Sequence, residues 1–203
     1  MELLILVPSE VEIQGLSLPE ERFKITCCGV GLVAAAATTA QLVSLHHPDA
    51  LLLLGVCGAY ASSGLHIGDV LRVDHSILAD FGVQDSEGHL LRAEGLGLGE
   101  NKIPAPPLSQ IPDSLSWLNR RLSSIPGVTS ASVQCACGTE ALAKTRAKFA
   151  LIEEMEGAAV LSVASAFSIP TYHVRAVSNR AGRREPALWR IPEALDQLRQ
   201  WLL

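Results

Sequence analysis

The sequence has few aromatic residues and no run of basic residues, and both shortages restrict what it can bind. Aromatic residues make up 4% of the 203 residues, and the formal net charge is −5. Proteins that bind nucleic acids present a basic surface to the phosphates and aromatic rings to the bases. A nucleic-acid partner is therefore not expected. The one dense basic cluster holds Arg180, Arg183 and Arg184, which fits either a solvated loop or contact with an anionic ligand.

A membrane-spanning run and a secretory signal are also not expected. The apolar start through Val7 lacks the basic residues and the small-residue cleavage site of a signal peptide. A longer uncharged stretch, 25–48, is interrupted by Gly29, Gly31 and Pro48, as suits a strand, a turn and a buried helix. No membrane partner follows from these segments.

The cysteines lack the paired spacing of zinc sites. All five lie in apolar or glycine-rich segments: Cys27, Cys28, Cys57, Cys135 and Cys137. They are expected to be reduced thiols that are packed or line a pocket, in a cytoplasmic protein. No metal and no cofactor is expected.

A dinucleotide-binding motif is imitated by Gly29-x-Gly31-x-x-Ala34, but its context is wrong. The glycines follow the second expected strand, and the next acidic residue, Asp49, precedes a strand instead of ending one. A tight turn between strand and helix explains these glycines without NAD.

Short apolar runs alternate with helical segments along the chain. Hydrophobic residues make up 48%, and the mean hydropathy is +0.28, as expected for a sheet covered on both faces. Strands are predicted at 3–7, 23–28, 51–54, 69–79, 128–135, 151–155 and 172–178, with a glycine-rich loop after 54 and a loop-like stretch at 86–112. The sequence thus predicts an α/β fold: one domain, 1–203, with three layers around a central mixed sheet.

Polar residues lie where the predicted strands end or helices begin, the positions at which α/β proteins bind ligands. Glu156 opens a helix and Asn179 follows the strand 172–178, so both are expected to face one small-molecule pocket. Glu10 and Glu12 follow the first strand, and an extended loop would point them the same way, whereas a helix would not. Alternatively, these are a helix-dipole carboxylate, a strand-end cap and solvated charges.

Several motifs, in order, give the chain a resemblance to the nucleoside phosphorylase/nucleosidase superfamily. The block G-V-G-L-V-A-A-A-A from Gly29 and the run M-E-G-A-A from Met155 resemble methylthioadenosine/adenosylhomocysteine nucleosidases. The motifs A-D-F-G-V-Q-D from Ala79, G-T-E from Gly138 and S-N-R-A-G-R-R from Ser178 resemble the futalosine hydrolase family more closely. The resemblance covers most of the chain and implies a nucleoside phosphorylase-like fold.

The resemblance implies that water cleaves the N-ribosidic bond of futalosine and releases hypoxanthine, in the alternative menaquinone pathway. Glu12 lies where the nucleosidases keep the carboxylate that activates water, and Glu156 matches the one that accepts hydrogen bonds from ribose. Met155, Gly58 and Thr139 are the further substrate-binding residues expected.

Asn179 departs from the methylthioadenosine nucleosidases, which carry an aspartate there. An amide cannot give the leaving purine a proton, but its NH2 can donate to N7 and O6 of a 6-oxopurine. This favours hypoxanthine or guanine over adenine. We further expect Arg184 to meet a carboxylate on the far side of the substrate.

Three other functions stay open on the sequence alone. One is cleavage of methylthioadenosine, adenosylhomocysteine or 6-amino-6-deoxyfutalosine. Another is phosphorolysis, although the loop after the first strand carries carboxylates and no cation for phosphate. The third is a nucleoside-binding protein without catalysis. Family members are commonly homodimers, so a homodimer is expected, with 91–111 as the segment that completes the partner's pocket.

Overall fold

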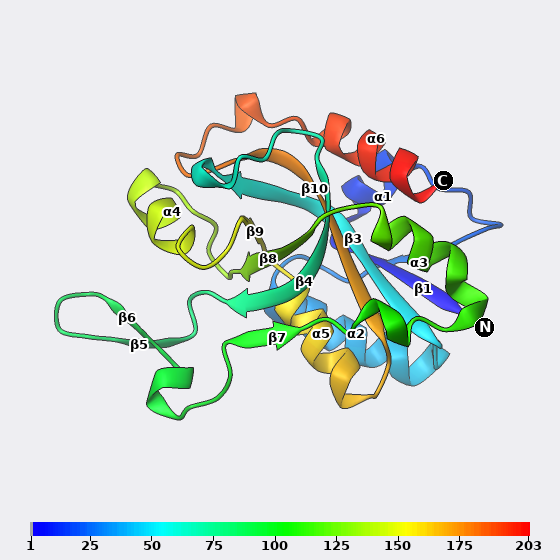
Figure 1. Cartoon of the computed structure of the whole chain (residues 1–203), viewed down its shortest axis with the longest axis horizontal. Coiled ribbons are helices and arrows are strands. Elements are labelled where there is room, and N and C mark those ends of the chain that lie inside the picture. Colours follow the sequence, from blue (N-terminus) through cyan, green and yellow to red (C-terminus); the bar gives the residue numbers. More distant parts are fainter. Residues whose placement is uncertain (1) are drawn as a thin grey trace.

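The computed structural model describes residues 2–203 and shows the predicted mixed α/β arrangement in three layers (Figure 1). The central sheet has eight strands. They are β1 (Leu3–Val7), β2 (Lys24–Cys27), β3 (Ala50–Tyr60), β4 (Val70–Leu78), β7 (Lys102–Pro104), β8 (Gly127–Ser132), β9 (Ile152–Glu154) and β10 (Thr171–Ala181). A separate hairpin pairs β5 (Gly82–Gln84) with β6 (Leu90–Arg92).

The sheet closes on itself around its longest strands. Its order is β10-β4-β8-β9-β3-β1-β2, and β10 also pairs with β3. The pairs β1–β3 and β3–β10 are parallel, whereas β4–β10 and β3–β9 are antiparallel. The carboxyl ends of β1, β3 and β10 therefore lie at one edge, which is where parallel sheets bind ligands.

Helices cover both faces of the sheet (Figure 1). They are α1 (Glu10–Leu16), α2 (Leu32–His46), α3 (Ser116–Ser123), α4 (Glu140–Arg146), α5 (Gly157–Ala166) and α6 (Ile191–Leu202). Helices α2 and α5 pack together on one face, and α1 and α6 pack together on the other. No helix within residues 2–203 combines the length and the apolar character needed to cross a membrane.

The alternation of side chains along β1 shows why the strand is apolar throughout. Ile5 and Val7 belong to the core shared with α6, whereas Leu4 and Leu6 belong to the core shared with α2 and α5. Successive side chains of a strand point to opposite faces. Because helices cover both faces, every position of β1 after Leu3 is buried.

Three segments that the sequence suggests are loops are instead regular structure. The glycine-rich segment after residue 54 continues β3 as far as Tyr60, and β10 continues past Ser178 to Ala181. The segment after β1 is helix α1 and not an extended loop, so Glu10 is exposed while Glu12 is buried. Residues two apart on a helix point in different directions, so the two carboxylates do not share an orientation.

The stretch 86–112 is also more ordered than a loop. It contains β6 and β7, and β7 pairs with β4 in the main sheet. The β5–β6 hairpin projects away from the body of the molecule (Figure 1).

Candidate active site

A cavity of about 610 Å³ lies where β1, β3 and β10 end. Its volume is within the roughly 300–1,000 Å³ of small-molecule sites. The sequence-predicted residues in its lining are Glu12, Gly58, Met155, Glu156, Asn179 and Arg184. Thr139 is placed differently, because its side chain accepts a hydrogen bond from the backbone N–H of Leu142 (3.2 Å) and so caps α4. Its neighbour Gly138 lines the cavity.

Glu12 is held rigidly at the cavity by two hydrogen bonds. Its Oε1 accepts from the backbone N–H of Val56 (3.1 Å), and its Oε2 accepts from the hydroxyl of Ser9 (2.8 Å). Ser9 is also the N-cap of α1 and accepts from the backbone N–H of Glu12. A serine followed three residues later by a glutamate is a helix-start signal. That spacing could have predicted α1 from the sequence.

Glu156 is the residue that immediately precedes the first turn of α5. Its Oε1 accepts a hydrogen bond from the backbone N–H of Gly31 (3.0 Å), and its Oε2 accepts from Nη2 of Arg175 (2.9 Å). The residue is 3% exposed. Burial raises the pKa of Glu156, against the opposing charge of Arg175. The carboxylate therefore lines the cavity with both oxygens engaged by donors.

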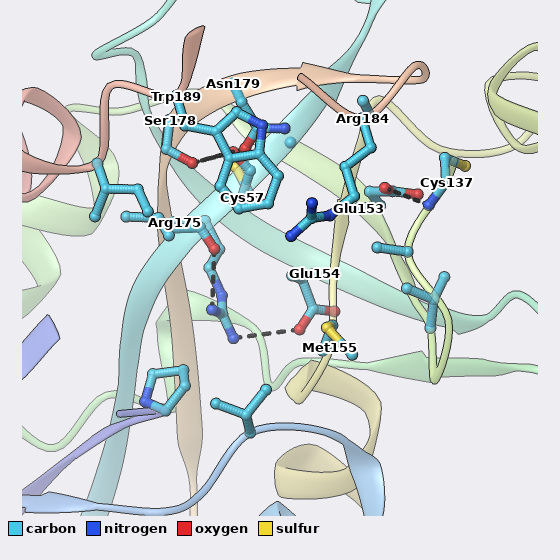
Figure 2. Close-up of a pocket in the computed structure, with 18 of the residues that line it drawn as sticks. Cys57, Cys137, Glu153, Glu154, Met155, Arg175, Ser178, Asn179, Arg184 and Trp189 are labelled. Atoms are coloured by element: carbon cyan, nitrogen blue, oxygen red, sulfur yellow. Dashed lines mark hydrogen bonds and ion pairs between the residues drawn. The ribbon is translucent and has the colours of Figure 1, made fainter. Parts of the chain in front are cut away.

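Arg175 is the main residue of the site that the sequence reasoning missed. It lies on β10, is 1% exposed and reaches the cavity (Figure 2). Its Nη2 contacts Glu154 (3.2 Å) and Glu156 (2.9 Å), and its Nη1 donates to the carbonyl of Val56 (3.2 Å). A side chain at Gly55 would collide with this guanidinium. An arginine inside an apolar strand was the signal in the sequence, because a fully buried arginine needs partners and so indicates a polar site.

Glu154, also missed, anchors the start of α5. Its Oε2 accepts from the backbone N–H groups of Glu156 (2.8 Å) and Gly157 (2.6 Å), and its Oε1 accepts from the hydroxyl of Ser132. Burial by itself raises the pKa of Glu154, but Arg175 leads the groups that outweigh burial, and the net pKa is lowered. An ionised carboxylate at a helix N-terminus is favourable. Glu154 thus fixes the backbone that carries Glu156.

Asn179 lies directly after an irregularity in the pairing of β10 with β3. Its Oδ1 accepts from the hydroxyl of Ser178 (2.9 Å), and its Nδ2 donates to the carbonyl of Arg180 (3.1 Å). Gly58 is its partner across the strands, and an added Cβ there would lie 3.1 Å from Nδ2. The glycine therefore leaves room for the amide. Because one amide hydrogen already has an acceptor, donation to two purine atoms requires rotation of the side chain.

The three arginines of the basic cluster differ in their partners. Arg180 pairs with Glu140 (3.4 Å) and Arg183 pairs with Glu185 (3.5 Å). Arg184 has no carboxylate partner among residues 2–203, and its guanidinium carbon lies 5.5 Å from the centre of the Trp189 ring. Figure 2 shows Arg184 pointing into the cavity with Trp189 nearby. An anionic group in the cavity could therefore pair with Arg184.

The cysteines are free thiols, as predicted. Burial raises the pKa of Cys57 and of Cys137 to about 12, so both line the cavity as neutral groups. Within residues 2–203, no three His, Cys, Asp or Glu side chains are grouped so that they could hold a metal ion.

Comparison with known proteins identifies the family to which the chain belongs. The sequence matches the phosphorylase superfamily over residues 16–202, and the chain belongs to that family. The match begins after Glu12, so the family model does not include that residue.

Two kinds of N-glycosyl hydrolase are among the relatives within that superfamily. A futalosine hydrolase of Streptomyces coelicolor is 30% identical over 94% of this chain and 82% of its own length. The futalosine hydrolase of Thermus thermophilus is 33% identical over 84% of this chain and 75% of its own length. A 5'-methylthioadenosine/S-adenosylhomocysteine nucleosidase of Aeromonas salmonicida is 30% identical over 79% of this chain and 70% of its own length.

Solved structures of both kinds share the fold. Futalosine hydrolase of Helicobacter pylori superposes with a TM-score of 0.77 at 17% identity and covers 100% of this chain and 95% of its own. The nucleosidase of Colwellia psychrerythraea, in complex with adenine, gives a TM-score of 0.75 at 19% identity. The match covers 100% of this chain and 93% of that one.

Proposed function

We propose that this protein is a futalosine hydrolase, which uses water to release hypoxanthine from futalosine in the alternative menaquinone pathway. The observation that carries the proposal is the placement of Glu12, Glu156 and Asn179 around one cavity. A base for water, an acceptor for ribose hydroxyls and a donor for a purine edge are the groups that this reaction needs. The futalosine hydrolase relatives, matched over most of the chain, support the same substrate.

Glu12 is the proposed general base. Its two hydrogen bonds fix the carboxylate at the cavity wall, so a water molecule held there would be presented to the anomeric carbon in one orientation. Glycosidic cleavage passes through an oxocarbenium-like transition state. The carboxylates of Glu12 and Glu156 stabilise that positive charge as it develops.

The charges around Glu12 and Arg175 favour hydrolysis over phosphorolysis. Phosphate needs a free cation, but the contacts of Arg175 are taken by Glu154, Glu156 and Val56. Glu12 adds a negative charge that repels phosphate. Cleavage at the same rate in phosphate-free buffer is expected, and a requirement for phosphate would contradict the proposal.

The leaving purine is recognised by Asn179 in this proposal. Its NH2 donates to the acceptors of a 6-oxopurine, whereas adenine offers an amino donor at that edge. The test is chromatography of the base released from a panel containing futalosine, inosine, 6-amino-6-deoxyfutalosine and methylthioadenosine. Hypoxanthine from futalosine should be released fastest. Adenine release at a matching rate would instead support the function of the nucleosidase relatives.

Arg184 is proposed to bind the carboxylate at the far end of futalosine, because it has no acidic partner in the described part of the chain and points into the cavity. Arg184→Ala should raise KM for futalosine about tenfold or more, as loss of a charge-assisted hydrogen bond predicts. Inosine has no such carboxylate, so its KM should not change. The control is Arg190→Ala, because Arg190 is outside the cavity lining and pairs with Glu193. An unchanged KM for futalosine in Arg184→Ala would remove Arg184 from the site.

We also propose that the protein is a cytoplasmic homodimer in which each subunit is one domain, 1–203. The β5–β6 hairpin and the turn after it expose apolar side chains at Val83, Leu90, Leu91, Leu96 and Leu98. Exposed apolar side chains of this kind are typical of a protein interface. Sedimentation equilibrium should give twice the chain mass. Replacing Leu91 and Leu98 with Ser should shift the mass towards that of one chain, and an unchanged dimer would place the interface elsewhere.

A further inference from the structure

A buried histidine lies beside the arginine of the site. His173 is on β10 two positions before Arg175, so both side chains project to the same face of the strand. It is 0% exposed, and its Nε2 contacts Nε of Arg175 at 2.7 Å. Burial lowers the pKa of His173 to about 3, so the imidazole is neutral near pH 7.

The direction of this hydrogen bond fixes where the imidazole carries its proton. Arginine only donates, so Nε2 of His173 is the acceptor and the proton is on Nδ1. Within residues 2–203, Nδ1 has no hydrogen-bond partner. An unpaired buried N–H is unfavourable, and an apolar side chain would avoid it. Among residues 2–203, the imidazole thus makes its one polar contact with Arg175.

That contact completes the set of bonds that orient the guanidinium. Nη1 donates to Val56, and Nη2 reaches the two glutamates, but these bonds leave Nε without another acceptor. The ring lies close to Gly157, where an added Cβ would collide with Cε1 of His173. Loss of the Nε acceptor would remove one of the four contacts that orient the guanidinium, and we expect Nη2 to move relative to Glu156 as a result.

We propose that His173 is a positioning residue, which orients Arg175 and through it the Glu156 carboxylate that faces the ribose. The kinetic part of this inference rests on the proposed function. His173 itself is absent from the cavity lining, so its effect passes through the guanidinium.

Three substitutions separate this role from simple filling of space. In His173→Gln the amide oxygen reaches about as far as Nε2, whereas in His173→Asn it reaches only to the place of Nδ1. His173→Leu fills the space with no acceptor. Displacing a catalytic group in this way lowers kcat about 10- to 100-fold. We expect that loss in the Asn and Leu variants, with a smaller change in KM, while Gln keeps kcat within about threefold of the wild type.

Thermal unfolding of the three variants provides the control for folding. Rescue by Gln should be seen in kcat even where its Tm equals that of the Asn variant. Equal kcat in all three variants, or a kcat that follows Tm, would overturn the proposal.

A second measurement does not depend on the substrate. Imidazole ¹⁵N shifts of histidine-labelled protein should show His173 as the Nδ1–H tautomer between pH 5 and 8, with Nε2 unprotonated. A protonated Nε2 would contradict the inference whether or not the protein cleaves nucleosides. If the wild type cleaves none of the panel while this tautomer is found, the proposed function fails and the contact with Arg175 stands.

Discussion

Glu12→Gln is expected to lower kcat for futalosine by about 10²- to 10⁴-fold, the usual contribution of a general base. Glutamine has the same shape, and its amide oxygen can still accept from the N–H of Val56, while its NH2 can donate to the hydroxyl of Ser9. The two bonds that hold the side chain are therefore retained, and only the capacity to take a proton from water is lost. Steady-state rates of hypoxanthine release measure the effect.

Glu10→Gln is the matched control for this substitution. Glu10 belongs to the same helix and is exposed, so its loss should leave kcat unchanged. A Glu12→Gln variant with wild-type turnover would remove Glu12 as the base. A wild type that binds nucleosides without turnover, and binds equally after Glu12→Gln, would establish the non-catalytic alternative.

Arg175→Met is expected to destabilise the fold by about 3–5 kcal/mol, the range for removing one partner of a buried ion pair. Glu154 is 4% exposed and Glu156 is 3% exposed, so neither carboxylate gains water in place of the cation. Denaturant unfolding at pH 7 measures the change in the free energy of unfolding. Arg180→Met is the control, because the Arg180–Glu140 pair is largely exposed and exposed pairs contribute little.

The stability of Arg175→Met should depend on pH in a characteristic way. Without the cation, the pKa values of both carboxyls in the folded state rise above the ordinary value of 4.5. The folded variant then binds more protons than the unfolded chain above pH 4.5, so its stability falls as the pH rises. The deficit relative to the wild type should be largest near pH 7 and shrink towards pH 4.5. A deficit that is constant over this range would show that lost packing, and not charge, destabilises the variant.

The order of strands and helices was predictable because it depends on local patterns. Apolar runs such as Leu3–Val7 mark buried strands, and the carboxyl ends of parallel strands lie at one edge of a sheet. Glu12, Glu156 and Asn179 follow or precede such segments, so their presence at one cavity could be predicted from position alone. The extension of β3 through Gly55 and Gly58 could not be predicted from the sequence, since glycines usually weaken a strand. Here they leave room for the Arg175 guanidinium and the Asn179 amide.

The fold class can be read from the sequence, and so can the set of polar side chains that reach the ligand edge, because both follow from periodicity and neighbouring residues. The pairing of those side chains depends instead on contacts between residues far apart in the chain. Gly31 and Glu156 are 125 positions apart, and Val56 and Arg175 are 119 apart, yet each pair shares a hydrogen bond. The buried cation, its two carboxylates and the neutral imidazole of His173 are stable only as partners of one another, since a lone buried charge is strongly unfavourable. No local pattern encodes that partnership, so it emerges only when the closed sheet brings β10, β9 and β3 together.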